Sequence, residues 1–310
     1  MDPQLEAFLR QVLVGLSIGC YLALIALGYT MVYGIVELIN FAHGDLFTFG
    51  FFISLTIWGL FDVPTPLEGA WILALPAIAI VVILLSGGLN VVIERVAYRP
   101  LRGASKLAPL ITAVGMSFML EAIFAYIWGA NQINYPRFIP TTNFLNDFSR
   151  IIRFTPRDIL LFGVTIPAMI GLTLFIDRTR LGKAMRAAAQ DREAAAMMGI
   201  NVNRIIAITF FIGGGLAGVA GMVYGLYTGS GRFIMGFEFG LFAFTAAVLG
   251  GIGNIRGAVF GAFIIGMVQA MSDLYIGGEW SRVIIFSLLI LMLVFRPSGI
   301  LGSTTSVEKV

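Results

Sequence analysis

Long apolar stretches, each long enough or nearly long enough to cross a bilayer, dominate this sequence. A membrane-spanning helix needs about 20 mostly apolar residues. Of the 310 residues, 58% are hydrophobic and only 12% are charged, whereas a soluble domain carries roughly 25% charged residues. Because so few charges cannot cover the surface of a soluble protein of this size, the sequence predicts an integral membrane protein.

Nine stretches are candidate spans, and three of them are short enough to be broken, tilted or re-entrant. The nine are Val12–Tyr33, Leu46–Phe61, Trp71–Ile93, Leu107–Trp128, Ile159–Ile176, Ile205–Tyr227, Phe239–Ile252, Ala258–Tyr275 and Val283–Phe295, of which the second, seventh and ninth are short. We therefore expect an all-α polytopic membrane protein with about eight or nine transmembrane helices, within a range of roughly seven to ten. It is predicted to form one transmembrane domain over residues 1–310, with no appended soluble domain.

The distribution of Lys and Arg predicts the orientation in the membrane. Two loops rich in these residues, 94–106 and 178–204, are separated by two spans and are both expected inside. With nine spans the N-terminus lies outside and the C-terminus inside, although an even count with both ends inside remains possible. The longest polar segment, 129–158, is then outside, either as a surface for an extracytoplasmic partner or as a connector.

Composition and motif context exclude several function classes. A net charge of +3 is too small for a nucleic-acid-binding protein. The single Cys20 excludes an internal disulfide and a cysteine-based metal site. A G-x-S-x-G match at 15–19 and a G-x-G-x-x-G match at 213–218 both lie inside apolar spans, without the preceding strand that each motif requires. No phosphate-binding loop is present in the sequence, so no nucleotide site is expected.

Many of the 37 glycines fall within spans at small-xxx-small spacing, a pattern typical of closely packed membrane helices. The glycines expected at such contacts are Gly214, Gly218, Gly221, Gly257 and Gly261.

Polar residues at membrane depth are costly and often functional. Glu121 is the carboxylate placed most clearly within a span, and structural pairing or a role in a pathway fits it equally well. Interruptions around His43 and Asn254 suggest two related halves, each with a broken helix near the pathway. Asp45 or Gly44 is expected to cap a helix that starts near Leu46. The candidate pathway residues are Tyr33, Asn40, His43, Asp45, Glu121 and Asn254.

The charged segment Arg178–Asn203 is predicted to contain a short helix outside the bilayer. Asp191 is a suitable N-cap, Glu193 favours the first turn, and Gly199 is a natural terminator. A helix of about two turns is marginal alone, so it is expected to dock either on a partner or on its own membrane domain. The residues assigned to this coupling loop are Arg186, Ala187, Asp191, Arg192, Glu193, Ala194, Ala195 and Gly199.

Several segments closely resemble the LivH and LivM family of permeases. They read GYTMVYGIVELINFAHGDLFTFG (28–50), LITAVGMSFMLE (110–121), RAAAQDREAAAMMGINVNRIIAITFFIGGGLAGVAG (186–221), FTAAVLGGIGNIRGAVFGA (244–262) and RPSGILG (296–302). The resemblance covers nearly the whole chain.

This resemblance implies the permease fold of an ABC importer for Leu, Ile or Val in the bacterial inner membrane. It implies a LivM-like second permease, two ATPase subunits that hold ATP and Mg, and an extracytoplasmic binding protein, with no cofactor on this chain itself. The loop 178–204 would then couple to the ATPases. Because the family also transports urea and short amides, that substrate class is an alternative. Two others are an ion-coupled secondary transporter and a membrane hydrolase using Ser17 and His43.

Overall fold

The structure is a computed structural model that describes residues 2–36, 40–60, 71–105, 107–136, 139–146, 149 and 151–302, with the backbone alone at 71–73. Lys106 of the first basic loop, Phe61 at the end of the second predicted span and the tail 303–310 lie outside the described residues. Within the described chain the α-helices are α1 Pro3–Val36, α2 His43–Leu60, α3 Trp71–Ile93, α4 Leu107–Trp128, α5 Pro156–Arg178, α6 Arg180–Gln190, α7 Arg192–Met197, α8 Val202–Thr228, α9 Met235–Gly250, α10 Ile255–Tyr275 and α11 Gly278–Phe295.

Short elements complete the described fold. A π-helical turn η2 (Glu94–Tyr98) and a 3-10 turn η3 (Arg99–Leu101) continue α3. The two-residue strands β1 (Ile133–Asn134) and β2 (Ser230–Gly231) pair antiparallel, which ties the loop after α4 to the end of α8.

A helix forms at each of the nine predicted spans, but seven helices of the described chain are long and apolar enough to cross a bilayer. They are α1, α3 with its continuation to Leu101, α4, α5, α8, α10 and α11. Of the three stretches expected to be short, α11 meets this criterion, whereas α2 and the 16-residue α9 do not. The all-α polytopic architecture is therefore confirmed.

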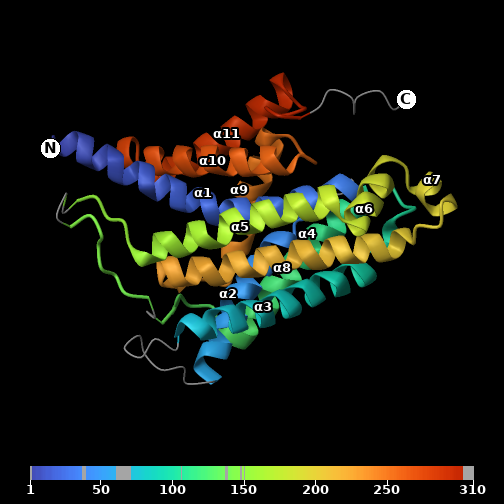
Figure 1. The fold of residues 1–310 in the computed structure, drawn as a ribbon, viewed down its shortest axis with the longest axis horizontal. Helices are drawn as coiled ribbons and strands as arrows, with labels where there is room; N and C mark the ends of the chain where they lie inside the picture. Colours follow the sequence, from blue (N-terminus) through green and yellow to red (C-terminus); the bar gives the residue numbers. More distant parts are fainter. Residues whose placement is uncertain are drawn as a thin grey trace.

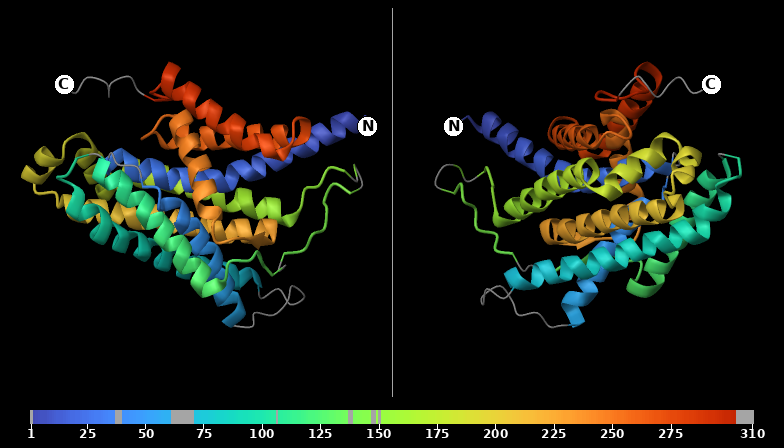
Figure 2. Two further views of the ribbon diagram at one scale, coloured as in Figure 1. Left: turned by 180° about the vertical axis from the view of Figure 1, so that it is seen from behind. Right: turned by 45° about the vertical axis from the view of Figure 1, so that its right-hand side comes forward.

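The long helices lie roughly side by side along one direction, as Figure 1 shows for α1, α3, α5 and α8. The N-terminus and the start of α5 lie at one end, and α6 and α7 lie at the other. In Figure 2, α9 crosses this direction steeply. It packs against α1, α2, α10 and α11 in the interior, so a short helix occupies the centre of the bundle.

The two basic loops lie at the same end, as the charge distribution predicts. The Arg102 guanidinium (Nη1) donates a hydrogen bond to Asn203 Oδ1 at 2.5 Å, which joins the first loop to the start of α8. The opposite end holds Arg10 and the loop before α5, where Arg10 and Arg153 line one recess.

The five glycines singled out for packing lie in helix–helix contacts. A Cβ at Gly214 or Gly218 would collide with Ser86 on α3, and one at Gly221 would collide with the Phe47 carbonyl on α2. Gly257 faces Gly250, and Gly261 faces the Ala246 carbonyl. Close backbone approach is how membrane helices gain van der Waals contact where lipid supplies no hydrophobic driving force.

The predicted start of α2 is wrong. The helix begins at His43 rather than near Leu46, because Asn40 to Ala42 form a turn whose carbonyls accept the first backbone N–H groups. Asp45 therefore lies inside the first turn and does not act as the cap.

Candidate functional site

The α6–α7 segment forms a compact corner at one end of the bundle (Figure 1). Thr179 caps α6 by accepting a hydrogen bond from the Gly182 N–H at 2.9 Å. The Asp191 carboxylate caps α7, accepting from the N–H groups of Glu193 at 2.8 Å and Ala194 at 3.0 Å. Gly199 ends the segment at φ +82°, where an L side chain is strained. The predicted cap and terminator are confirmed, and the charged segment forms two helices.

One side of α7 is anchored to the bundle and the other side is open. Ala195 is buried, and Arg192 donates to the Ile35 carbonyl at the end of α1 at 2.8 Å. Met197 and Met198, by contrast, are 82% and 83% exposed. Exposed methionines are adaptable contact residues. The corner therefore presents an exposed apolar surface and is held to α1 through Arg192.

A cavity of about 750 Å³ lies next to this corner. Tyr33 on α1, Arg186 on α6 and Asn254 before α10 all line it. Arg186 donates to the Ile176 carbonyl, and its Nη1 lies 3.9 Å from the Asp177 carboxylate. Asn254 caps α10 through the Gly257 N–H at 3.1 Å and donates to the Leu301 carbonyl at 2.8 Å. Any movement of α6 therefore changes the wall of this cavity; the nearby Ala187 is half-buried.

Buried polar side chains gather at the start of α2, near the middle of the bundle. His43 and Asp45 are fully buried, and the His43 ring lies 4.6 Å from the Tyr29 ring, centroid to centroid. Neither ring nitrogen of His43 nor either Asp45 oxygen has a hydrogen bond of ordinary geometry to a described residue. The Ser117 hydroxyl on α4 and the half-buried Glu121 lie near enough to Asp45 to interact with it. Such groups are expensive inside a membrane unless water or a ligand satisfies them.

Asn40 does not belong to this cluster. Its Oδ1 accepts from the Tyr98 hydroxyl at 2.8 Å, and its Nδ2 donates to Asn90 Oδ1 at 3.4 Å. Asn90 in turn donates to the Phe210 carbonyl at 2.7 Å. This buried network joins the turn before α2 to α3 and α8, and it satisfies the Asn40 side chain through partners that sequence reasoning missed.

One face of α9 carries aromatic side chains that contact α4 and α1. Phe237 stacks on Phe118 of α4 with ring centroids 6.3 Å apart. Seven residues and about two helical turns further along, the Phe244 ring lies 6.1 Å from the Tyr29 ring, centroid to centroid. Phe244 and Tyr33 line a small void of about 10 Å³, and Tyr33 also lines the large cavity. The aromatic face thus leads from α4 to the α6–α7 end.

An ion pair lies at the first turn of α9. The Arg282 guanidinium on α11 binds the Glu238 carboxylate through two hydrogen bonds, Nε at 2.6 Å and Nη2 at 3.1 Å. The pair is largely open, with side chains 64% and 38% exposed. An open bidentate pair presents both signs of charge to a ligand, and sequence reasoning did not identify it.

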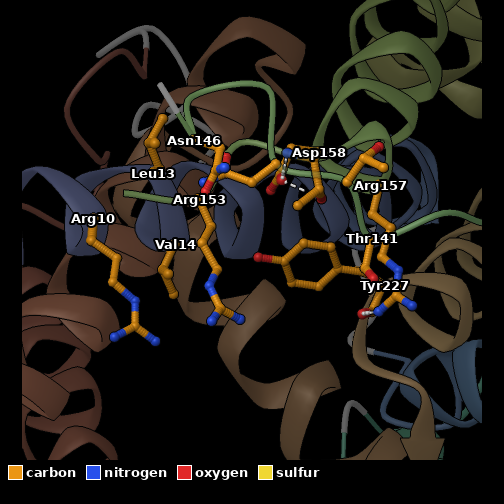
Figure 3. Close-up of a pocket in the computed structure, with 12 residues that line it drawn as sticks. Arg10, Leu13, Val14, Thr141, Asn146, Arg153, Arg157, Asp158 and Tyr227 are labelled. Carbon is orange, nitrogen blue, oxygen red and sulfur yellow. Dashed lines mark hydrogen bonds between the residues drawn. The ribbon is translucent and has the colours of Figure 1, made fainter. Parts of the chain in front are cut away.

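A basic recess of about 800 Å³ lies at the opposite end of the bundle (Figure 3). Arg10 on α1 and Arg153 before α5 extend their guanidinium groups on the same side, as Figure 3 shows. Asp158, the acidic residue of the lining, accepts hydrogen bonds from the Thr155 N–H and the Ser17 hydroxyl, both at 2.8 Å. Because Arg10, Arg153 and Arg157 outnumber this one carboxylate, the recess has a net positive charge.

The hydrolase hypothesis fails on the same contact. The Ser17 hydroxyl, buried on α1, donates to Asp158, while His43 lies against Tyr29 and Gly28. A nucleophile needs its base within hydrogen-bond reach, and here the serine is paired with a helix-capping carboxylate instead.

Comparison with known proteins identifies the family. A family described as "Branched-chain amino acid transport system / permease component" matches residues 11–293. The chain belongs to this family. It is 44% identical to the high-affinity branched-chain amino acid transport system permease protein BraD of Pseudomonas aeruginosa, over 99% of this chain and 100% of BraD. It is 41% identical to the permease protein LivH of Escherichia coli strain K12, over 100% of both chains.

A solved structure of PsaBC from Streptococcus pneumoniae in complex with Fab is also similar, at 12% identity with 96% of this chain and 93% of that chain covered. Its TM-score is 0.44, from which no structural conclusion follows. As a member of the permease family with seven candidate spans in its described part, the chain is a multi-pass membrane protein.

Proposed function

We propose that this chain is a membrane permease subunit of an ABC importer that moves Leu, Ile or Val into the cell. The observation that carries the proposal is the match of 41–44% identity along the whole chain to permeases named for branched-chain amino acid transport. Urea, short amides and ion coupling, the other possibilities raised by the sequence, appear in neither of those names.

The proposed assembly has three kinds of partner. A LivM-like second permease completes the pathway, two ATPase subunits supply the energy, and an extracytoplasmic binding protein delivers the substrate. No phosphate-binding loop occurs in this sequence, so ATP and Mg belong to the ATPases and this chain has no catalytic role. The complex is placed in the inner membrane. Because the two basic loops lie at the α6–α7 end, we place α6, α7 and the C-terminus on the cytosolic side and the N-terminus outside.

The substrate path in this proposal follows the face of α9. A branched-chain amino acid is a zwitterion with an apolar side chain. Arg282 and Glu238 match its two charges at the outer end. The Phe237 and Phe244 rings match its side chain, and the Tyr33 cavity receives it at the inner end. His43, Asp45 and Glu121 lie beside this face, where a passing ligand or water satisfies their polar atoms.

The α6–α7 corner is the proposed ATPase-docking element. Support comes from its exposed Met197 and Met198, from its anchor through Arg192 to α1, and from the cavity wall that Arg186 shares. An ATPase that binds Met197 and Met198, and changes conformation during its ATPase cycle, would move α6 relative to the cavity.

Reconstitution tests the proposal. The chain is purified with its co-expressed neighbours and placed in proteoliposomes, and uptake of labelled leucine is measured with ATP and the binding protein present. Uptake is expected to require ATP and to be unaffected by an imposed proton or sodium gradient. Leucine uptake by this chain alone, driven by an ion gradient, would overturn it, whereas ATP-driven uptake of urea instead of leucine would overturn the substrate assignment only.

A further inference from the structure

A second basic recess, of about 480 Å³, lies where α3 ends and α8 begins. Its walls include Arg95 and Arg99 from the turns that continue α3, and Arg204 from the first turn of α8. Phe211, about two helical turns further along α8, also lines it. Volumes in this range suit small ligands. The recess includes Asn201, Asn203 and Arg204 at the end of the loop 178–204, but its lining contains no residue of α6, α7 or α9 and none of the large cavity.

The charges of this recess are not balanced within the described part of the chain. Glu94, the acidic residue of the lining, is buried and is bound by Arg102, which also donates to Asn203. Arg95, Arg99 and Arg204 are exposed and form no ion pair or side-chain hydrogen bond with any described residue. The N-terminus of the 27-residue α8 adds its partial positive charge.

The depth of the recess and its surroundings indicate the ligand. The apolar span of α3 ends at this point in a π-helical turn, an irregularity that is frequent at functional sites. Along the same helix, Leu84, Val92 and Val96 are 55%, 55% and 67% exposed. A cationic recess at the end of a span, continuous with an exposed apolar strip, matches a molecule with an anionic head and hydrocarbon tails.

We propose that this recess binds the phosphate headgroup of an anionic phospholipid, whose acyl chains lie along the exposed face of α3. Arginine suits this role because its planar guanidinium binds phosphate oxygens through paired hydrogen bonds. Basic pockets between membrane helices bind such headgroups in other proteins. A docked acidic protein would use the arginines but not the apolar strip, so the strip favours a lipid.

The test uses the full chain purified with its co-expressed subunits. Native mass spectrometry counts phosphatidylglycerol retained by the permease, with phosphatidylcholine of the same acyl chains as the neutral comparison. The variant is Arg95→Gln/Arg99→Gln/Arg204→Gln. We expect phosphatidylglycerol binding to weaken by about fivefold for each arginine removed, hence roughly 100-fold in total, while phosphatidylcholine binding stays the same.

Two matched variants guard the interpretation. The Arg178→Gln/Arg180→Gln/Lys183→Gln variant removes three exposed cations at the same end but outside the recess, and it is expected to bind lipid as the parent does. The Arg95→Lys/Arg99→Lys/Arg204→Lys variant keeps the charge but loses the planar guanidinium groups, so it is expected to bind phosphatidylglycerol more tightly than the Gln variant and less tightly than the parent.

Three outcomes contradict the proposal. Unchanged phosphatidylglycerol binding by the triple Gln variant would show that these three arginines do not form a lipid-binding site. Equal weakening in the control variant shows general charge attraction in place of a site. Displacement of the lipid by soluble glycerophosphate at equal concentration shows that the recess takes a free phosphate compound and that the apolar strip contributes nothing.

Discussion

At the scale of single residues, the turn before α2 divides neighbouring side chains between two environments. The Asn40 side chain is hydrogen-bonded to Tyr98 and Asn90, whereas His43, three residues later, faces Tyr29, and neither of its nitrogens has a hydrogen bond of ordinary geometry to a described residue. The sequence predicts that polar residues interrupt a span here, but the Asn40 partners are 50 or more positions away. The pattern of residues therefore predicts where the buried polar side chains lie, but not that Asn40 and His43 have different environments.

Glu121 separates an ATP-driven permease from an ion-coupled one. In the Glu121→Gln variant the charge is lost and hydrogen bonding is kept, so we expect ATP-driven leucine uptake to stay within about fivefold of the parent, the effect of one altered hydrogen bond. Uptake into proteoliposomes at fixed ATP measures it. Abolished uptake in a complex that still contains its ATPases would instead support coupling through this carboxylate.

Gly221 tests the close packing of α8 on α2. A Cβ at this position meets the Phe47 carbonyl, so Gly221→Ala is expected to destabilise the protein by about 1–3 kcal/mol, as overpacking does. Gly88 on α3 has no neighbouring atom within 4 Å of a built Cβ. Gly88→Ala is therefore the matched control, expected to leave stability unchanged or raise it by up to about 1 kcal/mol. Thermal unfolding in detergent measures both, and equal melting temperatures for the two variants would contradict the packing account.

At the scale of elements, α7 shows what a local pattern can predict. Its cap Asp191, first-turn acid Glu193 and terminating Gly199 lie close together in the chain, and the observed hydrogen bonds of Asp191 and the φ of Gly199 follow from them. The start of α2 shows the opposite case. Its three-residue difference from prediction comes from a backbone turn at Asn40–Ala42, and several turn conformations suit the same residues.

The docking role of α7 predicts two disruptive substitutions. Glu193→Lys places a cation at the positive end of the helix, and Gly199→Val forces a β-branched residue to φ +82°. Each is expected to lower recovery of the ATPases with the permease by about fivefold or more, consistent with a loss of at least about 1 kcal/mol, while membrane insertion stays normal. Affinity pull-down with quantification of the ATPases measures this.

Gly103 supplies the matched control for the glycine substitution. It lies in an exposed turn at the same end, without a positive φ and with no atom within 4 Å of a built Cβ. Gly103→Val is expected to recover the ATPases as the parent does. Normal recovery with Glu193→Lys and with Gly199→Val would refute the docking role of α7.

At the scale of the whole molecule, apolar length and charge distribution predict the membrane class and the common end of the two basic loops. They do not predict that α2 and α9 form the short interior helices, because α11 is equally short in sequence and still qualifies as a span. Position in the bundle decides this: α9 is enclosed by four other helices. The proposed substrate path along α9 likewise depends on tertiary contacts, and the Glu238–Arg282 pair joins residues 44 positions apart.

Exchanging the charges of that pair distinguishes a transport role from a structural one. The double variant Glu238→Arg/Arg282→Glu keeps an ion pair, and because exposed pairs contribute about 1 kcal/mol or less, the melting temperature is expected to stay close to that of the parent. A zwitterion that meets both residues would find each charge reversed. Losing one charge-assisted hydrogen bond, about 1.5 kcal/mol, predicts roughly tenfold slower leucine uptake, measured at saturating ATP in proteoliposomes.

Each single variant, Glu238→Arg or Arg282→Glu, should also take up leucine slowly, because its two like charges repel each other. Full uptake by the exchanged pair, with slow uptake by the single variants, would show that the pair only joins α9 to α11 and that the substrate passes elsewhere.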